Sequence, residues 1–218
     1  MIKDNLNEVR ASLRDGVCLV AVSKYHPVEA VEAAYAEGQR IFGESREQEL
    51  RVKYDTLPKD IQWHFIGHLQ TNKVKYIAPY ITMIETVDSL KLMREIEKQA
   101  ERCGRVIDIL LELHLAQEET KSGMTLDECR ALLQGGEWRD IIHVRICGIM
   151  MMASNTDDEE EIKREFLAAN DFFGEVKARY FADDEAFAVK SYGMSHDYLL
   201  AQECGSNHVR VGSRIFSE

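Results

Sequence analysis

The feature that most restricts how this chain can fold is a regular alternation of short apolar runs with longer amphipathic ones. Eight apolar runs read as strands, beginning with VCLVAV at 17–22. The others lie at 40–44, 62–67, 81–87, 106–115, 141–151, 186–194 and 208–216. Helix-like patterns separate them, at 28–37, 46–54, 69–77, 90–103, 126–133, 158–180 and 196–204. Strands that alternate with helices indicate right-handed βαβ units and a parallel sheet.

The number of these units predicts the architecture. Eight of them in 218 residues favour a closed (β/α)8 barrel of the TIM type over an open doubly wound sheet. No low-complexity linker interrupts the chain, so we expect one domain spanning residues 1–218. The sequence ends just after the eighth strand-like run, so we expect no helix after it. A helix-like segment at 3–13 precedes the first strand, and we expect it to pack beside the closing strands instead.

Composition excludes several classes of protein. The formal net charge is −11, which argues against a nucleic-acid-binding surface and favours a soluble cytoplasmic protein. No apolar run approaches the roughly 18 residues of a membrane span, and no signal-peptide core occurs. The five cysteines are widely spaced and include no CxxC pair, so we expect reduced thiols and no bound metal.

Two cations lie at strand ends that should meet. In a (β/α)8 barrel, functional residues gather at the carboxyl ends of the strands. Side-chain alternation places Lys24 on the same face of the first strand as Val20 and Val22. The same rule places Arg210 and Gly212 on one face of the last strand. If these faces point inward, Lys24 and Arg210 share the barrel mouth and predict an anion or a carbonyl group between them.

The loops after the seventh and eighth strands indicate which anion. These loops form the usual phosphate site of the fold, and here they read SYGMSHD and VRVGSRIF. Gly193 and Gly212 would let the backbone approach a ligand closely, while Ser195 and Ser213 supply hydroxyl groups. Ser195 also lies where the N-cap of the 196–204 helix is expected. A phosphate is therefore the favoured anion.

The sequence allows two interpretations of Lys24. In the first, its ammonium group reaches solvent or pairs with Glu44, as strand-end lysines commonly do. Alternatively, a pocket of low polarity beside Arg210 would favour the neutral amine, which forms an imine with an aldehyde. An aldehyde that carries a phosphate suggests pyridoxal 5′-phosphate (PLP).

Eight segments resemble the pyridoxal phosphate homeostasis protein family, in the family's order and along nearly the whole chain. They are AVSKYHP, IFGESREQEL, WHFIGHLQTNK, ETVDS, ETKSGM, CGIMMMA, YGMSHDY and GSNHVRVGSRIF. WHFIGHLQ followed by NK is the most specific of them. The resemblance implies a barrel like the N-terminal domain of alanine racemase.

The resemblance also implies roles for individual residues. Lys24 would hold PLP as an internal aldimine. Ser195, Gly212 and Ser213 would hold its phosphate, and Arg210 would face the pyridine nitrogen. Because arginine only donates hydrogen bonds, the ring nitrogen would stay unprotonated, which disfavours strong carbanion chemistry. His64 is expected to point toward the pocket and Met150 to form part of its wall.

The sequence departs from the family pattern at a few positions. Ser45 replaces the asparagine of the family's FGEN motif near the cofactor, and its shorter reach puts that contact in doubt. Tyr25 follows Lys24 where threonine is usual. Residues 190–192 read KSY in place of a Leu-Ser-Met run. We expect none of these departures to touch Lys24, Arg210 or the phosphate loops.

Three functions fit these residues. The favoured one is a non-catalytic, monomeric PLP-binding protein that buffers the aldehyde and delivers it to PLP-dependent apoenzymes. The alternative is a PLP-dependent amino-acid racemase, which needs a second proton donor across the substrate. Tyr25 and Tyr192 are the tyrosines expected at the mouth, and nothing in the sequence places either on the required face. A Schiff-base aldolase acting on a phosphorylated sugar would share the lysine and the phosphate site.

Overall fold

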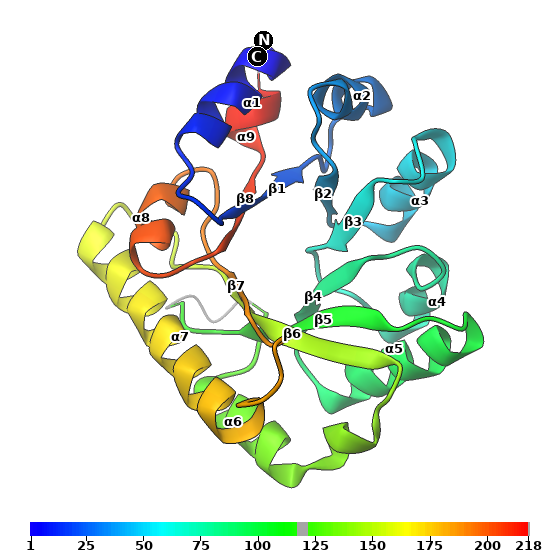
Figure 1. The fold of residues 1–218 in the computed structure, drawn as a ribbon, viewed down its shortest axis with the longest axis vertical. Coiled ribbons are helices and arrows are strands. Elements are labelled where there is room, and N and C mark those ends of the chain that lie inside the picture. The colour runs from blue at the N-terminus through cyan, green and yellow to red at the C-terminus, as the bar shows by residue number, and fades with distance from the viewer. Residues whose placement is uncertain (117–121, 218) are drawn as a thin grey trace.

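The computed structural model describes residues 1–116 and 122–217. Within these residues, eight parallel strands close into a barrel in chain order, with β8 beside β1 (Figure 1). The strands are β1 (Cys18–Val22), β2 (Ile41–Glu44), β3 (Gln62–Phe65), β4 (Met83–Val87), β5 (Ile107–Leu113), β6 (Val144–Met151), β7 (Val189–Ser191) and β8 (His208–Val211). The predicted TIM-type barrel is therefore confirmed.

Helices surround the barrel. They are α1 (Ile2–Ala11), α2 (Val28–Ala36), α3 (Glu47–Thr56), α4 (Val74–Ile77), α5 (Leu90–Arg102), α6 (Leu126–Gly135), α7 (Glu159–Tyr180), α8 (Tyr198–Glu203) and α9 (Ser213–Phe216). Two 3₁₀ segments, η1 (Thr71–Lys73) and η2 (Glu137–Asp140), complete the set. The predicted 69–77 helix is thus a 3₁₀ turn followed by one α-helical turn, and the predicted 186–194 strand keeps only three residues.

Two apolar layers hold the barrel together. The larger lies between the strands and the outer helices, and α5 illustrates it: Leu92, Met93 and Ile96 are buried on one face while charged residues occupy the other. The Ser89 hydroxyl accepts a hydrogen bond from the Leu92 amide and caps this helix. A smaller cluster of Met83, Leu110, Cys147 and Met150 packs separately, as alternation predicts for inward-facing side chains.

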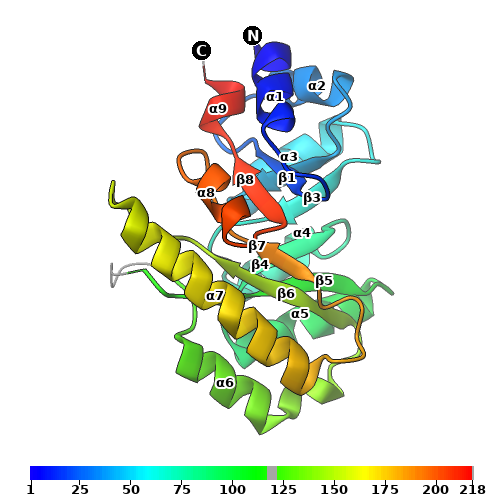
Figure 2. The same cartoon turned by 60° about the vertical axis from the view of Figure 1, so that its left-hand side comes forward.

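The two ends of the chain meet outside β1 and β8. Residues 208–216 do not form one strand, because Val211 ends β8 and α9 follows as a single helical turn. Helix α1 packs beside α9 (Figures 1 and 2), and the Asn5 side chain donates a hydrogen bond to the Ile215 carbonyl. The expected N-terminal helix is present, but it covers the closing strands together with a C-terminal helix that the sequence reading missed.

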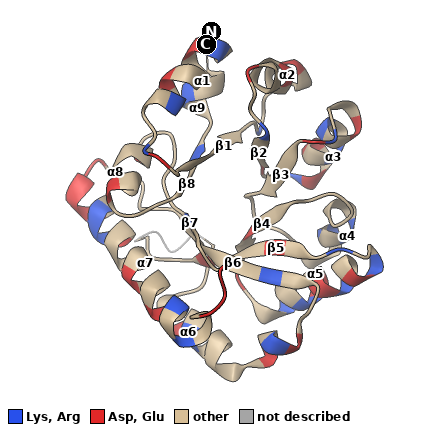
Figure 3. Cartoon of the chain, in the orientation of Figure 1, with Lys and Arg blue, Asp and Glu red and all other residues tan. Residues whose placement is uncertain are grey.

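Charged residues lie mainly on the outer helices and the connections, with both signs interspersed (Figure 3). Among the charged residues on strands, Glu44, Glu85, Glu112 and Arg210 are buried. Among the described residues, no helix combines the length and the apolar character needed to cross a bilayer. Part of the ETKSGM segment, at 119–121, lies outside the described residues.

Candidate functional site

A pocket opens at the carboxyl ends of the strands. Its volume is about 240 Å³, and it is bounded by β1, β8 and the segments that follow β1, β3, β6, β7 and β8. The residues that line it are Val22, Lys24, Ile66, Met152, Met194, Ser195, Arg210, Gly212 and Ser213. Five of the predicted cofactor-binding residues therefore meet in one place: Lys24, Ser195, Arg210, Gly212 and Ser213.

Lys24 lies in the turn just after β1 and is half-buried. Its ammonium group makes no hydrogen bond or ion pair with any described residue, and Nζ lies 5.8 Å from the centroid of the Tyr25 ring. Glu44, the carboxylate considered as a partner for it, binds Lys53 and Ser23 instead. The alternative in which Lys24 pairs with Glu44 is therefore wrong, and the amine is left at the pocket wall.

The loops after β7 and β8 are joined by a hydrogen bond. The Gly212 amide donates to the Ser195 hydroxyl over 3.0 Å. Gly193 has φ +90°, which favours glycine, and a Cβ atom on it would lie 2.6 Å from that of Ala201. A Cβ atom on Gly212 would lie 2.9 Å from the Val22 carbonyl oxygen. Both loops therefore approach their neighbours closely because glycine is present.

One detail predicted for these loops is wrong. Ser195 does not cap the following helix, which begins later and has Asp197 as its N-cap residue. The Asp197 carboxylate turns back and accepts a hydrogen bond from the Met194 amide over 2.6 Å. The loop is closed by this bond, which leaves Ser195 linked to Gly212 at the pocket.

Arg210 is held almost fully buried, with 3% of its surface exposed. Its Nη1 donates to both the carbonyl and the hydroxyl oxygen of Ser191, at 2.7 and 2.5 Å. Its Nη2 donates to the Met151 carbonyl over 2.9 Å. No hydrogen bond within the described part of the chain uses Nε. The guanidinium is thus fixed in position by β6 and β7, and its Nε–H group remains available as a hydrogen-bond donor.

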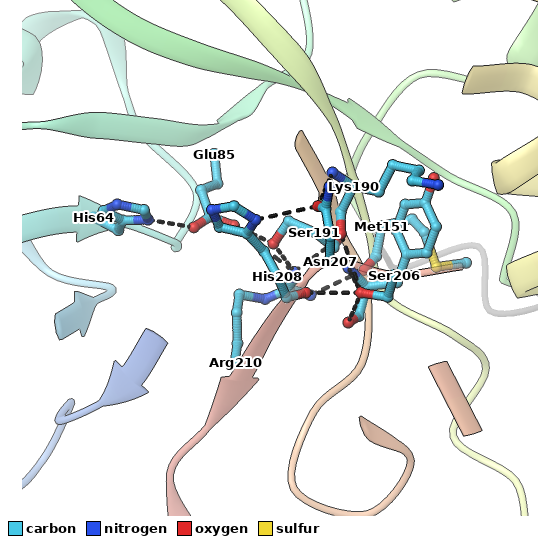
Figure 4. Close-up of polar contacts among 10 residues, drawn as sticks. His64, Glu85, Met151, Lys190, Ser191, Ser206, Asn207, His208 and Arg210 are labelled. Carbon is cyan, nitrogen blue, oxygen red and sulfur yellow. Dashed lines mark hydrogen bonds and ion pairs between the residues drawn. The ribbon is translucent and has the colours of Figure 1, made fainter. Parts of the chain in front are cut away.

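A carboxylate beneath the pocket compensates this buried charge (Figure 4). Glu85, in the middle of β4, lies 3.7 Å from Arg210 and accepts a hydrogen bond from the Ser191 hydroxyl over 2.6 Å. Its other oxygen lies 2.7 Å from His64 Nδ1. Burial alone would raise the pKa of Glu85, but the contacts with His64, Arg210 and Ser191 outweigh it and lower the pKa to about 2. Glu85 therefore stays ionised and neutralises Arg210.

Three other predicted residues lie outside the pocket lining. Ser45 borders a neighbouring hollow of about 290 Å³ together with His68 and Lys73. His64 faces inward but is engaged by Glu85, and Met150 is fully buried in the inner apolar cluster. Met152, two residues further along, forms the pocket wall instead. The roles predicted for these three residues stay predictions.

Sequence reasoning missed two members of the site and misplaced one residue. It assigned no role to Glu85, although this residue opens the ETVDS segment, and it expected Ser191 to be remote from Arg210, which it contacts directly. Tyr192 was expected at the mouth, but it is fully buried and stacks on Phe166 of α7. Tyr25 does lie at the mouth, beside Lys24.

The comparisons with known proteins agree with this geometry. The family model described as alanine racemase, N-terminal domain, matches residues 1–218. The pyridoxal phosphate homeostasis protein of Helicobacter pylori is 36% identical over 204 residues, which cover 93% of this chain and 88% of that protein. The chain belongs to the pyridoxal phosphate homeostasis protein family.

Members of this family occur well beyond one group of organisms. The pyridoxal phosphate homeostasis protein of Schizosaccharomyces pombe is 36% identical over 203 residues, covering 92% of this chain and 83% of that protein. Among solved structures, PipY of Synechococcus elongatus PCC7942 with PLP bound has a TM-score of 0.90 and 33% identity, and the match covers 100% of both chains. The predicted family and fold are confirmed by these matches.

Proposed function

We propose that this chain binds PLP in the pocket at the barrel mouth, holds it as an aldimine with Lys24, and buffers and delivers it without catalytic turnover. The observation that carries the proposal is that Lys24, whose amine has no partner among the described residues, meets the fixed Arg210 and two serine loops in one pocket. The PLP-bound structure of PipY, which has the same fold, supports the assignment. When bound, PLP supplies an aldehyde that condenses with an amine and releases water.

The loops after β7 and β8 have the chemistry of a phosphate site. Ser195 and Ser213 offer hydroxyl groups, and the first amides of α9 have no partner within that helix. Because Gly212 carries no side chain, a phosphate can approach the backbone here. We assign these residues to the phosphate end of the ligand.

Arg210 is suited to face the pyridine nitrogen. Glu85 compensates the charge of its guanidinium, and hydrogen bonds to Ser191 and the Met151 carbonyl orient it. The unused Nε can donate to an acceptor but cannot supply a proton to it, since arginine stays charged. The ring would then remain a weak electron sink, which supports a storage role over amino-acid chemistry.

Neither tyrosine considered for the racemase alternative is placed as a second base across the ligand from Lys24. Tyr192 is buried against α7, and Tyr25 projects from the turn that carries Lys24 itself, on the same side as the amine. Incubating the loaded protein with single-enantiomer alanine and measuring the mirror form by chiral chromatography tests this alternative. Sustained turnover would overturn the proposed storage role.

The binding proposal is tested by the absorption spectrum. We expect the protein mixed with PLP to show a band at about 420 nm that borohydride removes, as pyridoxal imines do. Lys24→Ala should abolish it, and mass spectrometry after reduction should place the adduct on Lys24. Lys190→Ala is the matched control, because this lysine lies on β7 and donates to Asn170. A band that survives in Lys24→Ala would sink the assignment.

Delivery requires recipients, which we propose to be PLP-dependent apoenzymes. The acidic composition and the free, widely spaced cysteines support a cytoplasmic location for such transfer. Mixing the loaded protein with an apoenzyme and following the recovery of that enzyme's activity tests transfer. Recovery no faster than with an equal concentration of free PLP would contradict active delivery.

A further inference from the structure

A buried ion cluster lies directly behind the turn that carries Lys24. Lys53 of α3 is only 2% exposed, and all three of its donor positions are used. Its Nζ donates to Glu44 Oε1 over 2.6 Å, to Glu49 Oε1 over 2.8 Å and to the Ser23 carbonyl over 2.8 Å. The side chains of Glu44, Glu49 and Lys53 do not line the pocket, so we do not expect this cluster to contact the ligand directly.

The cluster holds the residue before Lys24. The Ser23 hydroxyl donates to Glu44 Oε1 over 2.6 Å, while the Ser23 carbonyl accepts from Lys53. The Ser23 amide donates to the Gly43 carbonyl of β2. Every polar group of Ser23 is therefore engaged, and its orientation is set by β2 and α3.

The same cluster holds the residue after Lys24. The Tyr25 amide donates to Glu49 Oε1 over 2.7 Å. Tyr25 has φ +67°, and among the described residues it is the one non-glycine residue in the left-handed region. Such a conformation costs about 1–3 kcal/mol and persists where surrounding contacts impose it. Glu49 supplies that contact.

Stability alone gives no reason for this arrangement. A buried ion cluster is often no more stable than apolar side chains of similar size, because each charge loses its hydration. Burial raises the pKa of Glu44 despite its contacts with Lys53 and Ser23, and Glu44 Oε2 has no hydrogen-bond partner among the described residues. The cluster is therefore costly, and its contacts converge on the two neighbours of one lysine.

We propose that Glu44, Glu49 and Lys53 are positioning residues that fix the backbone on both sides of Lys24 and so direct its amine into the pocket. This inference rests on the proposed function, since it concerns the geometry of imine formation at Lys24. Glu49 is the most specific member, because it joins Lys53 to the strained Tyr25 amide.

Glu49→Ala tests the proposal with little risk to folding, since the Glu49 side chain is 23% exposed and Lys53 keeps Glu44. We expect the apparent Kd for PLP, read from the imine band, to rise about tenfold, or about 1.4 kcal/mol. Pyridoxine 5′-phosphate has no aldehyde and cannot form the imine. Its Kd should change less than about twofold, because the phosphate loops and Arg210 are untouched.

Two further variants separate positioning from general damage. Glu49→Gln keeps an oxygen that accepts from Tyr25, so it should bind PLP nearly as the unaltered chain does. In the Glu49→Ala background, Tyr25→Gly should restore most of the affinity, because glycine adopts a positive φ without strain. Tyr25→Ala also removes the ring but does not relieve the backbone, so it should restore nothing. If Glu49→Ala fails to fold, Glu49→Asp is used in its place, and the same pattern is expected.

The outcomes distinguish the two proposals. A chain that shows no Lys24-dependent band overturns the proposed function itself. A normal band in the unaltered chain, with PLP binding unchanged in Glu49→Ala, overturns only the positioning role. The positioning role is also overturned if pyridoxine 5′-phosphate binding weakens as much as PLP binding, or if Tyr25→Ala restores affinity as well as Tyr25→Gly does.

Discussion

Glu85 shows how a single residue makes the candidate site possible. Its carboxylate is fully buried, yet it stays charged because His64, Ser191 and Arg210 surround it. A buried guanidinium without such a partner would be strongly destabilising. The carboxylate therefore allows a cation to sit at the floor of the pocket, where a ligand can use it.

Glu85 should produce acid sensitivity. Its pKa is lowered from 4.5 to about 2 in the folded state, so the unfolded chain binds this proton more readily. The resulting stabilisation is complete above about pH 4.5 and is lost as the pH falls toward 2. We expect Glu85→Gln to be less stable at neutral pH and to lose this part of the pH slope in urea titrations. Glu8→Gln, on the exposed face of α1, should keep the slope, and an unchanged slope in Glu85→Gln would contradict the assignment.

His208 should make the stability of the fold depend on pH in a second, higher range. Burial is the main reason that its pKa falls from 6.5 to about 4. Between these values the unfolded chain binds a proton that the folded chain does not, so stability decreases as the pH drops from about 6.5 to 4. We expect His208→Gln to flatten urea-derived stability across this range. A variant whose stability still declines there as before would show that another group is responsible.

Two glycines should respond to alanine with opposite signs. In Gly212→Ala the new methyl group meets the Val22 carbonyl, so we expect a loss of about 1–3 kcal/mol and weaker phosphate binding. Gly174 lies inside α7 with open space around it, so Gly174→Ala should stabilise by roughly 0.5–1 kcal/mol. Thermal melts and phosphate competition measure both effects. Equal effects of the two substitutions would rule out the close approach at Gly212.

At the scale of elements, the pairing of α1 with α9 completes the barrel wall. Leu6 and Val9 of α1 are buried in the main core, and α9 directly follows the Gly212 loop. Each helix is too short to be stable alone, so each depends on the packing of the other. The position of the Gly212 loop thus depends on a helix from the opposite end of the chain.

Removing the apolar contact of α1 should be costly. Leu6→Ala deletes a fully buried side chain, and we expect a loss of about 2–5 kcal/mol of unfolding free energy. Glu8→Ala on the exposed side of the same helix should change stability by less than about 0.5 kcal/mol. Chemical denaturation of both variants provides the measurement. A small effect of Leu6→Ala would mean that α1 does not stabilise the closing strands.

At the scale of the whole molecule, charge favours separate chains. The net charge of −11 makes copies repel one another, and we expect a monomer of 25.0 kDa by light scattering. Ile142 lies just before β6, and its apolar side chain is 71% exposed. Among the large apolar side chains of the described residues, only that of Met1 is more exposed. A mass of twice this value that Ile142→Lys reduces to one chain would contradict the monomer and locate the interface.

The sequence alone determined the barrel, because βαβ periodicity is a local property that each segment carries for itself. Strand alternation predicted that Lys24 and Arg210 share the barrel mouth, and the usual phosphate site of the fold indicated the two glycine-serine loops. The tertiary structure decided which charged groups of different strands meet inside the barrel: Glu85 with Arg210, and His64 with Glu85. It also turned Tyr192 outward and made the last residues a helix. These outcomes depend on the relative rotation and register of strands distant in the chain, which no local pattern encodes.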